Sequence, residues 1–183
     1  MGLNILALDC GEHTGFATRI NGIERSGTEH WKHKTNESPG MKYLRFDWWL
    51  REMDGIGNFD LIVYEKPCHL QGNAIESMNG YITGIQRFIS QRDLGGKKID
   101  YEAIAPKTGK KFIKGKVPKS DVDELTKSLE KSLSPSAFKA LKTKIECIAW
   151  FKYITKREPA DDNEADAYAL LKYIENEIGE TNG

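Results

Sequence analysis

The chain has 183 residues, with 27 basic and 27 acidic side chains, and 39% of its residues are hydrophobic. This balance is typical of a folded globular protein and excludes a fibrous or intrinsically disordered chain. Apolar runs span only a handful of residues, whereas a membrane-spanning helix needs about 20, so we expect no membrane segment. Three scattered cysteines and an N-terminus unlike a signal peptide predict a reducing, cytoplasmic location.

The zero net charge conceals a strong segregation of charge along the chain. Residues 107–119 contain six lysines and no acid, whereas residues 158–183 contain eight acids and a single lysine. A chain with separate basic and acidic segments can bind a polyanion with one surface and cations with another.

Five segments have the pattern of β-strands: residues 3–9, 15–20, 23–32, 60–65 and 99–105. Asn21-Gly22 is a good hairpin turn between the second and third of them. The run DLIVYE at residues 60–65 is apolar almost throughout, which is typical of a strand buried on both faces.

Five further segments have helical spacing of apolar residues: residues 41–53, 73–91, 120–134, 136–155 and 160–178. Gly80 and Gly84 lie four residues apart in the second of them. They indicate either close approach by a neighbouring helix or two tolerated glycines. We expect residues 117–136 to be a helical insertion and residues 179–183 to be a frayed tail.

The order of these elements predicts one α/β domain over residues 1–183. Three strands come first, followed by helix, strand, helix, strand and then helices. This order predicts a mixed five-stranded sheet, antiparallel and then parallel, with helices on both faces.

Four carboxylates have positions that would bring them together. Asp9 and Glu65 each end an apolar strand, and parallel neighbouring strands would place them about 4.8 Å apart. Asp162 and Asp166 lie four residues apart at the start of the last helix and therefore share a face. A cluster of oxygen ligands without histidine or thiolate predicts Mg²⁺ or Mn²⁺, and two such ions can hydrolyse a phosphodiester.

Each carboxylate also has an ordinary structural interpretation. An acid at the end of a strand is most often a loop residue or a cap. Asp161 and Asp162 could cap the last helix or interact with its dipole. Taken together with the order of the elements, however, the four acids favour a shared site.

Four segments carry a resemblance to a known family: ILALDCGEHTGFA (5–17), LIVYEKP (61–67), APKTGKKFIKGK (105–116) and DDNEADAYALL (161–171). In this order and spacing they resemble the RuvC-like crossover-junction endonucleases of the RNase H superfamily. The resemblance spans residues 3–175. It implies an RNase H-like fold, a homodimer, and Mg²⁺-dependent, symmetrical nicking of four-way (Holliday) DNA junctions.

The resemblance also implies site residues. Asp9, Glu65 and Asp166 match three of the family's acids. The fourth family acid lies three residues before the last, where this chain has Asn163, so we expect the nearest acid, Asp162, to replace it. The insertion and the DDNEADA form resemble the bacteriophage-encoded branch, which would place the protein in the host bacterial cytoplasm.

The lysine-rich segment is a candidate DNA-backbone surface, in which Lys110 matches a family lysine. The alternative is an ordinary solvated loop. The predicted DNA-binding residues are Lys107, Lys110, Lys111, Lys114, Lys116 and Lys119. In the family the loop after the glutamate strand lies near the junction centre, where His69 or Leu70 could contact bases.

Two other functions are compatible with parts of this pattern. A non-catalytic protein could bind branched nucleic acid with the same surface. An ATP-dependent phosphotransferase of the actin and sugar-kinase superfamily also has an aspartate and a glycine after its first strand, but 183 residues leave no room for its two lobes.

Overall fold

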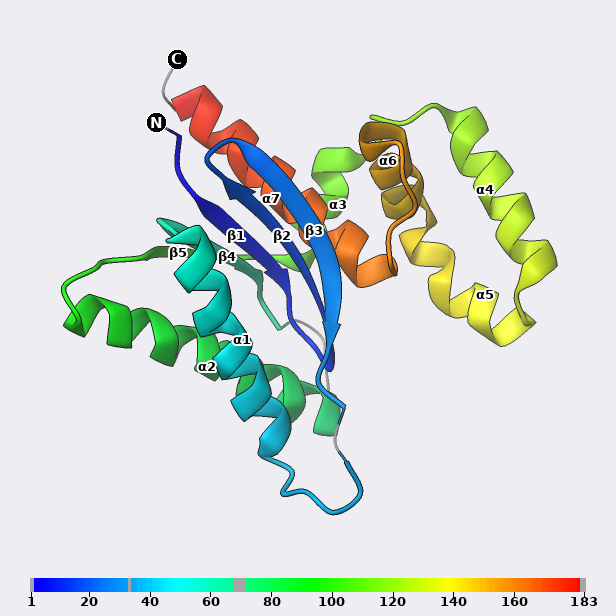
Figure 1. Ribbon diagram of the computed structural model, residues 1–183. Coiled ribbons are helices and arrows are strands. Elements are labelled where there is room, and N and C mark those ends of the chain that lie inside the picture. Colours follow the sequence, from blue (N-terminus) through cyan, green and yellow to red (C-terminus); the bar gives the residue numbers. More distant parts are fainter. Residues whose placement is uncertain (1, 33, 68–71, 182–183) are drawn as a thin grey trace.

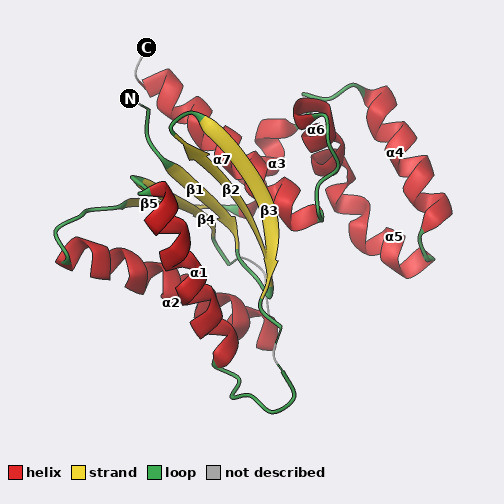
Figure 2. Cartoon of the chain, viewed as in Figure 1, coloured by secondary structure: helices red, strands yellow, loops and turns green. Residues whose placement is uncertain are grey.

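The computed structural model describes residues 2–32, 34–67 and 72–181. Within them, five strands form one sheet in the order β3-β2-β1-β4-β5. The strands are β1 (Ile5–Asp9), β2 (His13–Ile20), β3 (Ile23–His30), β4 (Leu61–Glu65) and β5 (Asp100–Ile104). β2 is antiparallel to β1 and β3, whereas β4 runs parallel to β1 and β5. This is the mixed sheet that the sequence predicts (Figure 2).

Helices cover both faces of this sheet. They are α1 (Met41–Gly57), α2 (Asn73–Leu94), α3 (Pro106–Ile113), α4 (Lys119–Ser132), α5 (Pro135–Leu141), α6 (Ile145–Thr155) and α7 (Asp162–Thr181), with a 3₁₀ turn, η1 (Lys142–Lys144), before α6. α1 and α2 lie together on one face, and α7 crosses the other with α3 and α6 beside it (Figure 1). α4 and α5 extend away from the sheet beyond α6.

Alternation along β1 divides the core into two parts. Ile5 and Ala7 belong to the core beneath α7, whereas Leu6 and Leu8 belong to the core beneath α1 and α2. Successive side chains of a strand point to opposite faces, which is why a continuous apolar run can be buried on both. By the same rule, the side chain of Asp9 lies on the same face of the sheet as those of Ile5 and Ala7, and α7 covers this face.

The two glycines of α2 mark a close helix crossing. A Cβ atom at Gly80 would overlap the ring of Tyr43, and one at Gly84 would lie 2.8 Å from a carboxylate oxygen of Asp47. Both contacts come from α1, so the close approach that these glycines indicate is confirmed. Because α1 belongs to the same chain, the glycines give no support to a dimer interface.

The prediction of a single helix over residues 136–155 is wrong. The segment forms two helices, α5 and α6, which are separated by η1. Its apolar positions keep helical spacing across the break, so periodicity could not reveal it. α5 has no buried residue, whereas α6 buries residues 145 and 147–151, so the chain turns where burial begins.

Other differences concern the bounds of single elements. α1 runs to Gly57 instead of residue 53, and α7 runs to Thr181, into the residues predicted to be a frayed tail. β2 begins at His13, two residues earlier than predicted. Residues 106–113, for which the sequence predicts neither a helix nor a strand, form α3, with Pro106 in its first turn, where a missing N–H is tolerated.

The predicted insertion, residues 117–136, comprises α4 and the start of α5. No side chain of α4 is buried, although Val122 and Leu125 pack against the core beneath α7. None of the helices in the described ranges combines the length and apolar character needed to cross a membrane.

Candidate active site

Asp9 and Glu65 lie side by side at one edge of the sheet. β1 and β4 pair in parallel from Ile5 opposite Leu61 to Leu8 opposite Tyr64, so the next two residues are the two acids. On β4, Val63 belongs to the core beneath α7, and Glu65 therefore shares its face. Both carboxylates therefore project toward the face that α7 covers.

The first turn of α7 packs directly on this edge. Gly15 pairs with Asp9 across β1 and β2, and a Cβ atom at Gly15 would overlap the carbonyl oxygen of Asn163. Only glycine leaves room for the helix backbone at this point. Gly15 therefore brings the start of α7, with Asp162 and Asp166, to the strand end that carries Asp9.

Asp161 and Asn163 hydrogen-bond to each other at the start of α7. Asp161 Oδ1 accepts hydrogen bonds from the backbone N–H groups of Asn163 (3.0 Å) and Glu164 (3.1 Å), so Asp161 is the N-cap of α7. The side chain of Asn163 donates to Asp161 Oδ2 at 3.3 Å. Of the two positions considered for the fourth acid, it is Asp162 that shares a partner with Asp166.

The four carboxylates interact electrostatically. Burial raises the pKa of Asp9 well above its ordinary value, and the negative charges of Asp166, Glu65 and Asp162 raise it further. Burial also raises the pKa of Glu65, with a further contribution from Asp166, although Lys110 and Lys144 oppose the change. Like charges held this close disfavour ionisation, so the cluster needs cations.

Lys144 supplies one positive charge to the cluster. Its Nζ lies 2.5 Å from Asp162 Oδ2 and 3.1 Å from Asp166 Oδ2. Although burial lowers the pKa of Lys144, the charges of Asp166, Asp162 and Asp9 raise it overall, so the side chain stays protonated. The lysine comes from η1, the turn that breaks the predicted helix.

The donor set suits Mg²⁺ or Mn²⁺, because all four predicted ligands are carboxylates. Among the described residues, no three acidic, histidine or cysteine side chains are arranged closely enough to hold one ion. The ammonium group of Lys144 already engages an oxygen of both Asp162 and Asp166. The residues therefore fit a hard divalent ion in the chemistry of their oxygen donors but not in their present spacing, and Lys144 would compete with such an ion.

Of the predicted DNA-binding lysines, Lys110 is the one placed at the carboxylates. It lines a small depression on α3 and α7 together with Glu65 and Asp166. All six lysines are exposed. Phe112, inside the same segment, packs its ring against Trp150 and Tyr173 and so anchors α3 to the core. The predicted base-contacting candidates, His69 and Leu70, lie outside the described residues.

Lys144 and Cys147 are not among the residues that the sequence predicts for this site. Both come from the start of the α6 segment, and the Cys147 thiol hydrogen-bonds to Asp166. Lys144 lies outside the lysine-rich segment and inside an uninterrupted helical pattern. No local feature of the sequence distinguishes it from other lysines of the region.

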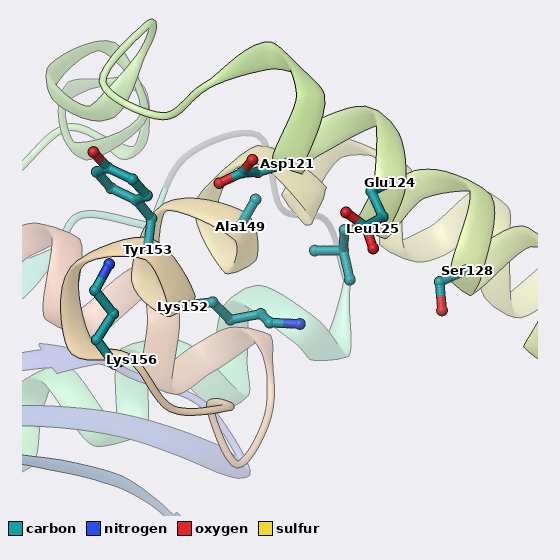
Figure 3. Close-up of a pocket in the computed structure, with 8 residues that line it drawn as sticks. All are labelled: Asp121, Glu124, Leu125, Ser128, Ala149, Lys152, Tyr153 and Lys156. Atoms are coloured by element: carbon teal, nitrogen blue, oxygen red, sulfur yellow. The ribbon is translucent and has the colours of Figure 1, made fainter.

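A larger pocket, of about 380 Å³, lies away from the carboxylates between α4 and α6 (Figure 3). Acids of α4, Asp121 and Glu124, line one side, and Lys152 and Lys156 line the other. Its mixed charge does not match a polyanion, and none of the four site carboxylates lines it.

Replacing Lys144 with Met is expected to destabilise the protein in the absence of divalent ions, because the carboxylates lose a partly buried partner. We expect Tm at pH 7 to fall by about 3–10 °C, as for a partly buried ion pair in a chain of this size. Saturating Ca²⁺ should recover more of the Tm in the variant than in the parent. Lys142→Met, in the same turn but exposed, is the control and should leave Tm unchanged.

No protein-family model and no curated protein matches this sequence. Solved structures do match. RuvC of Thermus thermophilus in complex with a Holliday junction substrate superposes with a TM-score of 0.64 at 12% identity, over 94% of this chain and 92% of that one. A second T. thermophilus RuvC structure gives 0.61 at 14% identity, over 97% of both chains.

The yeast mitochondrial Holliday junction resolvase matches as well, with a TM-score of 0.55 at 12% identity, over 92% of this chain and 76% of that one. The mixed five-stranded sheet with helices on both faces agrees with the fold that the resemblance of the four sequence segments implies. The chain therefore has a fold similar to that of T. thermophilus RuvC and of the yeast mitochondrial Holliday junction resolvase.

Proposed function

We propose that this protein is a metal-dependent endonuclease that hydrolyses phosphodiester bonds in branched DNA and resolves four-way junctions by paired nicks. The observation that carries the proposal is the meeting of Asp9, Glu65, Asp162 and Asp166 at one edge of a RuvC-like sheet. The junction bound to the similar T. thermophilus RuvC supports branched DNA as the substrate.

The four carboxylates would hold two Mg²⁺ ions, which Mn²⁺ could replace. When bound, the ions would supply activation of a water and charge stabilisation at the leaving oxygen. The chain's own residues orient the substrate and the ligands. Lys110 faces Glu65 and Asp166 and would bind the phosphate, while the packing of α7 on Gly15 fixes two of the four acids.

Cleavage of three DNA substrates, compared side by side, tests the proposal. A synthetic four-way junction, a fork and a linear duplex with the same arm sequences would be incubated with Mg²⁺, Mn²⁺, Ca²⁺ or chelator. We expect the junction to be nicked with Mg²⁺ or Mn²⁺ but not with Ca²⁺ or chelator. The linear duplex should stay intact under all four conditions. Tight junction binding without cleavage under any divalent ion would instead identify a non-catalytic binding protein.

The lysine-rich segment should make binding strongly dependent on salt. If its six lysines contact six phosphates, affinity should fall about 10³-fold between 50 and 200 mM salt. Replacing Lys107, Lys111 and Lys114 with Ala should reduce the slope of log K against log salt by about 2.7. The control replaces the exposed Lys127, Lys131 and Lys139, which removes the same charge outside the segment. An equal change in both variants would contradict a localised contact surface.

Paired nicks need two active sites, so we propose that the protein acts as a homodimer. Leu44 and Trp48, one turn apart on α1, are 45% and 59% exposed and offer an apolar surface for such a contact. Analytical ultracentrifugation of the parent and of Trp48→Glu tests this. We also propose that the protein acts in the cytoplasm; the bacteriophage origin stays a prediction.

A further inference from the structure

Alternate residues of β3 contact successive turns of α7. Three hydrogen-bonding pairs join the two elements: Thr28 with Asp161 at 2.6 Å, Ser26 with Glu164 at 2.8 Å, and Glu24 with Tyr168 at 2.6 Å. Lys172, one turn beyond Tyr168, also pairs with Glu24. All of these residues lie on one face of the strand and one stripe of the helix.

The spacings of the two elements explain why the pairs form together. Two residues of a strand advance about 6.7 Å, and four residues of a helix advance about 6 Å, so one polar residue of β3 meets each turn of α7. If α7 slid along β3 by one turn, all the pairs would break at once. The pairs therefore fix the register of the helix on the sheet.

Glu164 is the most enclosed member of this contact. Its side chain is 1% exposed, and its carboxylate accepts hydrogen bonds from Ser26, from Arg157 at 2.5 Å and from the backbone N–H of Ala160 at 2.5 Å. A buried carboxylate is costly unless it is fully paired, so it tolerates little displacement. Glu164 thus ties the first turn of α7 both to β3 and to the segment that follows α6.

Asp162 and Asp166 flank Glu164 in the sequence. They project from α7 about a third of a turn around the helix from the stripe that faces β3. Any rotation or slide of the helix on β3 would move both carboxylates relative to Asp9. The same contact that secures the helix therefore also sets the geometry of the carboxylate cluster.

We propose that Glu164, held by Ser26 and Arg157, is the positioning residue that aligns Asp162 and Asp166 with Asp9 and Glu65. This rests on the proposed function, because alignment matters only if the four acids bind ions together. Glu164 does not touch the ions or the substrate; it acts through α7.

The test compares Glu164→Gln with Glu24→Gln, which removes a charge from the same β3–α7 contact farther from the carboxylates. We expect both variants to lower Tm. Only Glu164→Gln should lower kcat for junction cleavage, by about tenfold or more with little change in KM, because small misplacements of catalytic groups have large effects. Only Glu164→Gln should raise the Ca²⁺ concentration at the midpoint of the ion-dependent Tm shift.

Equal effects of the two variants on kcat and on the Ca²⁺ midpoint would overturn the proposal and leave Glu164 a purely structural residue. If Glu164→Gln does not fold, Ser26→Ala leaves the Glu164 carboxylate in place and removes only the hydroxyl that hydrogen-bonds to Glu164 and Arg157. It should give the same pattern with smaller amplitude, and an unchanged Ca²⁺ midpoint there would also overturn the proposal. Failure of the parent to cleave any DNA would refute the proposed function, whereas the Ca²⁺ midpoints would still report on alignment.

Discussion

Replacing Asp9 with Asn is expected to reduce junction cleavage by about 10³-fold or more, as for the loss of a central catalytic group. The same variant should be more stable than the parent when no divalent ion is present. The reason is that burial raises the pKa of the Asp9 carboxyl, and the charges of Asp166 and Glu65 raise it further. An amide of the same shape removes this repulsion. Tm should rise by about 2–4 °C for each kcal/mol by which the free energy of unfolding increases.

The dependence of this gain on pH follows from the direction of the pKa shift. Below the pKa of an unfolded aspartate, near 3.9, Asp9 is protonated in both folded and unfolded chains, and its charge brings no penalty. As the pH rises from there to the raised native pKa, the folded protein loses stability relative to Asp9→Asn, and the difference then becomes constant. Thermal unfolding of both proteins between pH 3.5 and 8 in chelator measures it.

Glu12→Gln provides the matched control for the Asp9 variant, because it removes one exposed charge three residues away. We expect its Tm in chelator to equal that of the parent at every pH. A destabilised Asp9→Asn protein would show that the carboxylates do not repel one another. Undiminished cleavage by that variant would refute the nuclease proposal.

Gly15→Ala is the second change for which we expect a large effect, although it adds only one methyl group. That methyl would overlap the carbonyl oxygen of Asn163, which belongs to the helix backbone and cannot rotate aside. The first turn of α7 must then move away from β2. We expect a loss of about 1–3 kcal/mol in stability, as in overpacked cores, and a drop in cleavage of about 10²-fold from misplaced carboxylates.

Gly55→Ala separates this steric effect from the general effect of adding a Cβ atom. Gly55 lies in α1, where an added Cβ would meet nothing within 4 Å. This variant should raise Tm slightly, since alanine favours a helix by about 1 kcal/mol over glycine. Cleavage should not change. If Gly15→Ala behaved in the same way, the close packing of α7 on β2 would not be needed for activity.

The sequence resemblance matches Asp9, Glu65 and Asp166 to three acids. The fourth acid is the one that lies at a different position in this chain. The sequence resemblance predicts an acid at the position of Asn163, and the side chain of Asn163 donates a hydrogen bond to Asp161. Asp162 lies one residue earlier and reaches Lys144 together with Asp166. A shift of one residue turns a helical side chain by about 100°, so the displaced acid approaches the cluster from a different direction.

The sequence by itself determined the sheet and the face of each strand acid. Apolar runs that end in Asp9 and Glu65 are local features, and the alternation of a strand converts them directly into side-chain positions. The spacing of Asp162 and Asp166 likewise places them on one helical face without reference to the rest of the fold. For this reason the mixed sheet could be predicted, whereas the approach of these acids to one edge followed only on the condition that their strands are parallel neighbours.

Only the tertiary structure decided what holds those acids in place. Lys144 reaches them because η1 interrupts a continuous helical pattern, and Gly15 matters because a distant helix backbone rests on it. In the pairs that join β3 to α7, the two partners are separated in the sequence by between 133 and 144 positions. In the sequence, Glu164 is simply one acid among several in a first helical turn, where the helix dipole alone would explain it. Its partners are fixed by packing of the complete fold, which no local pattern of residues encodes.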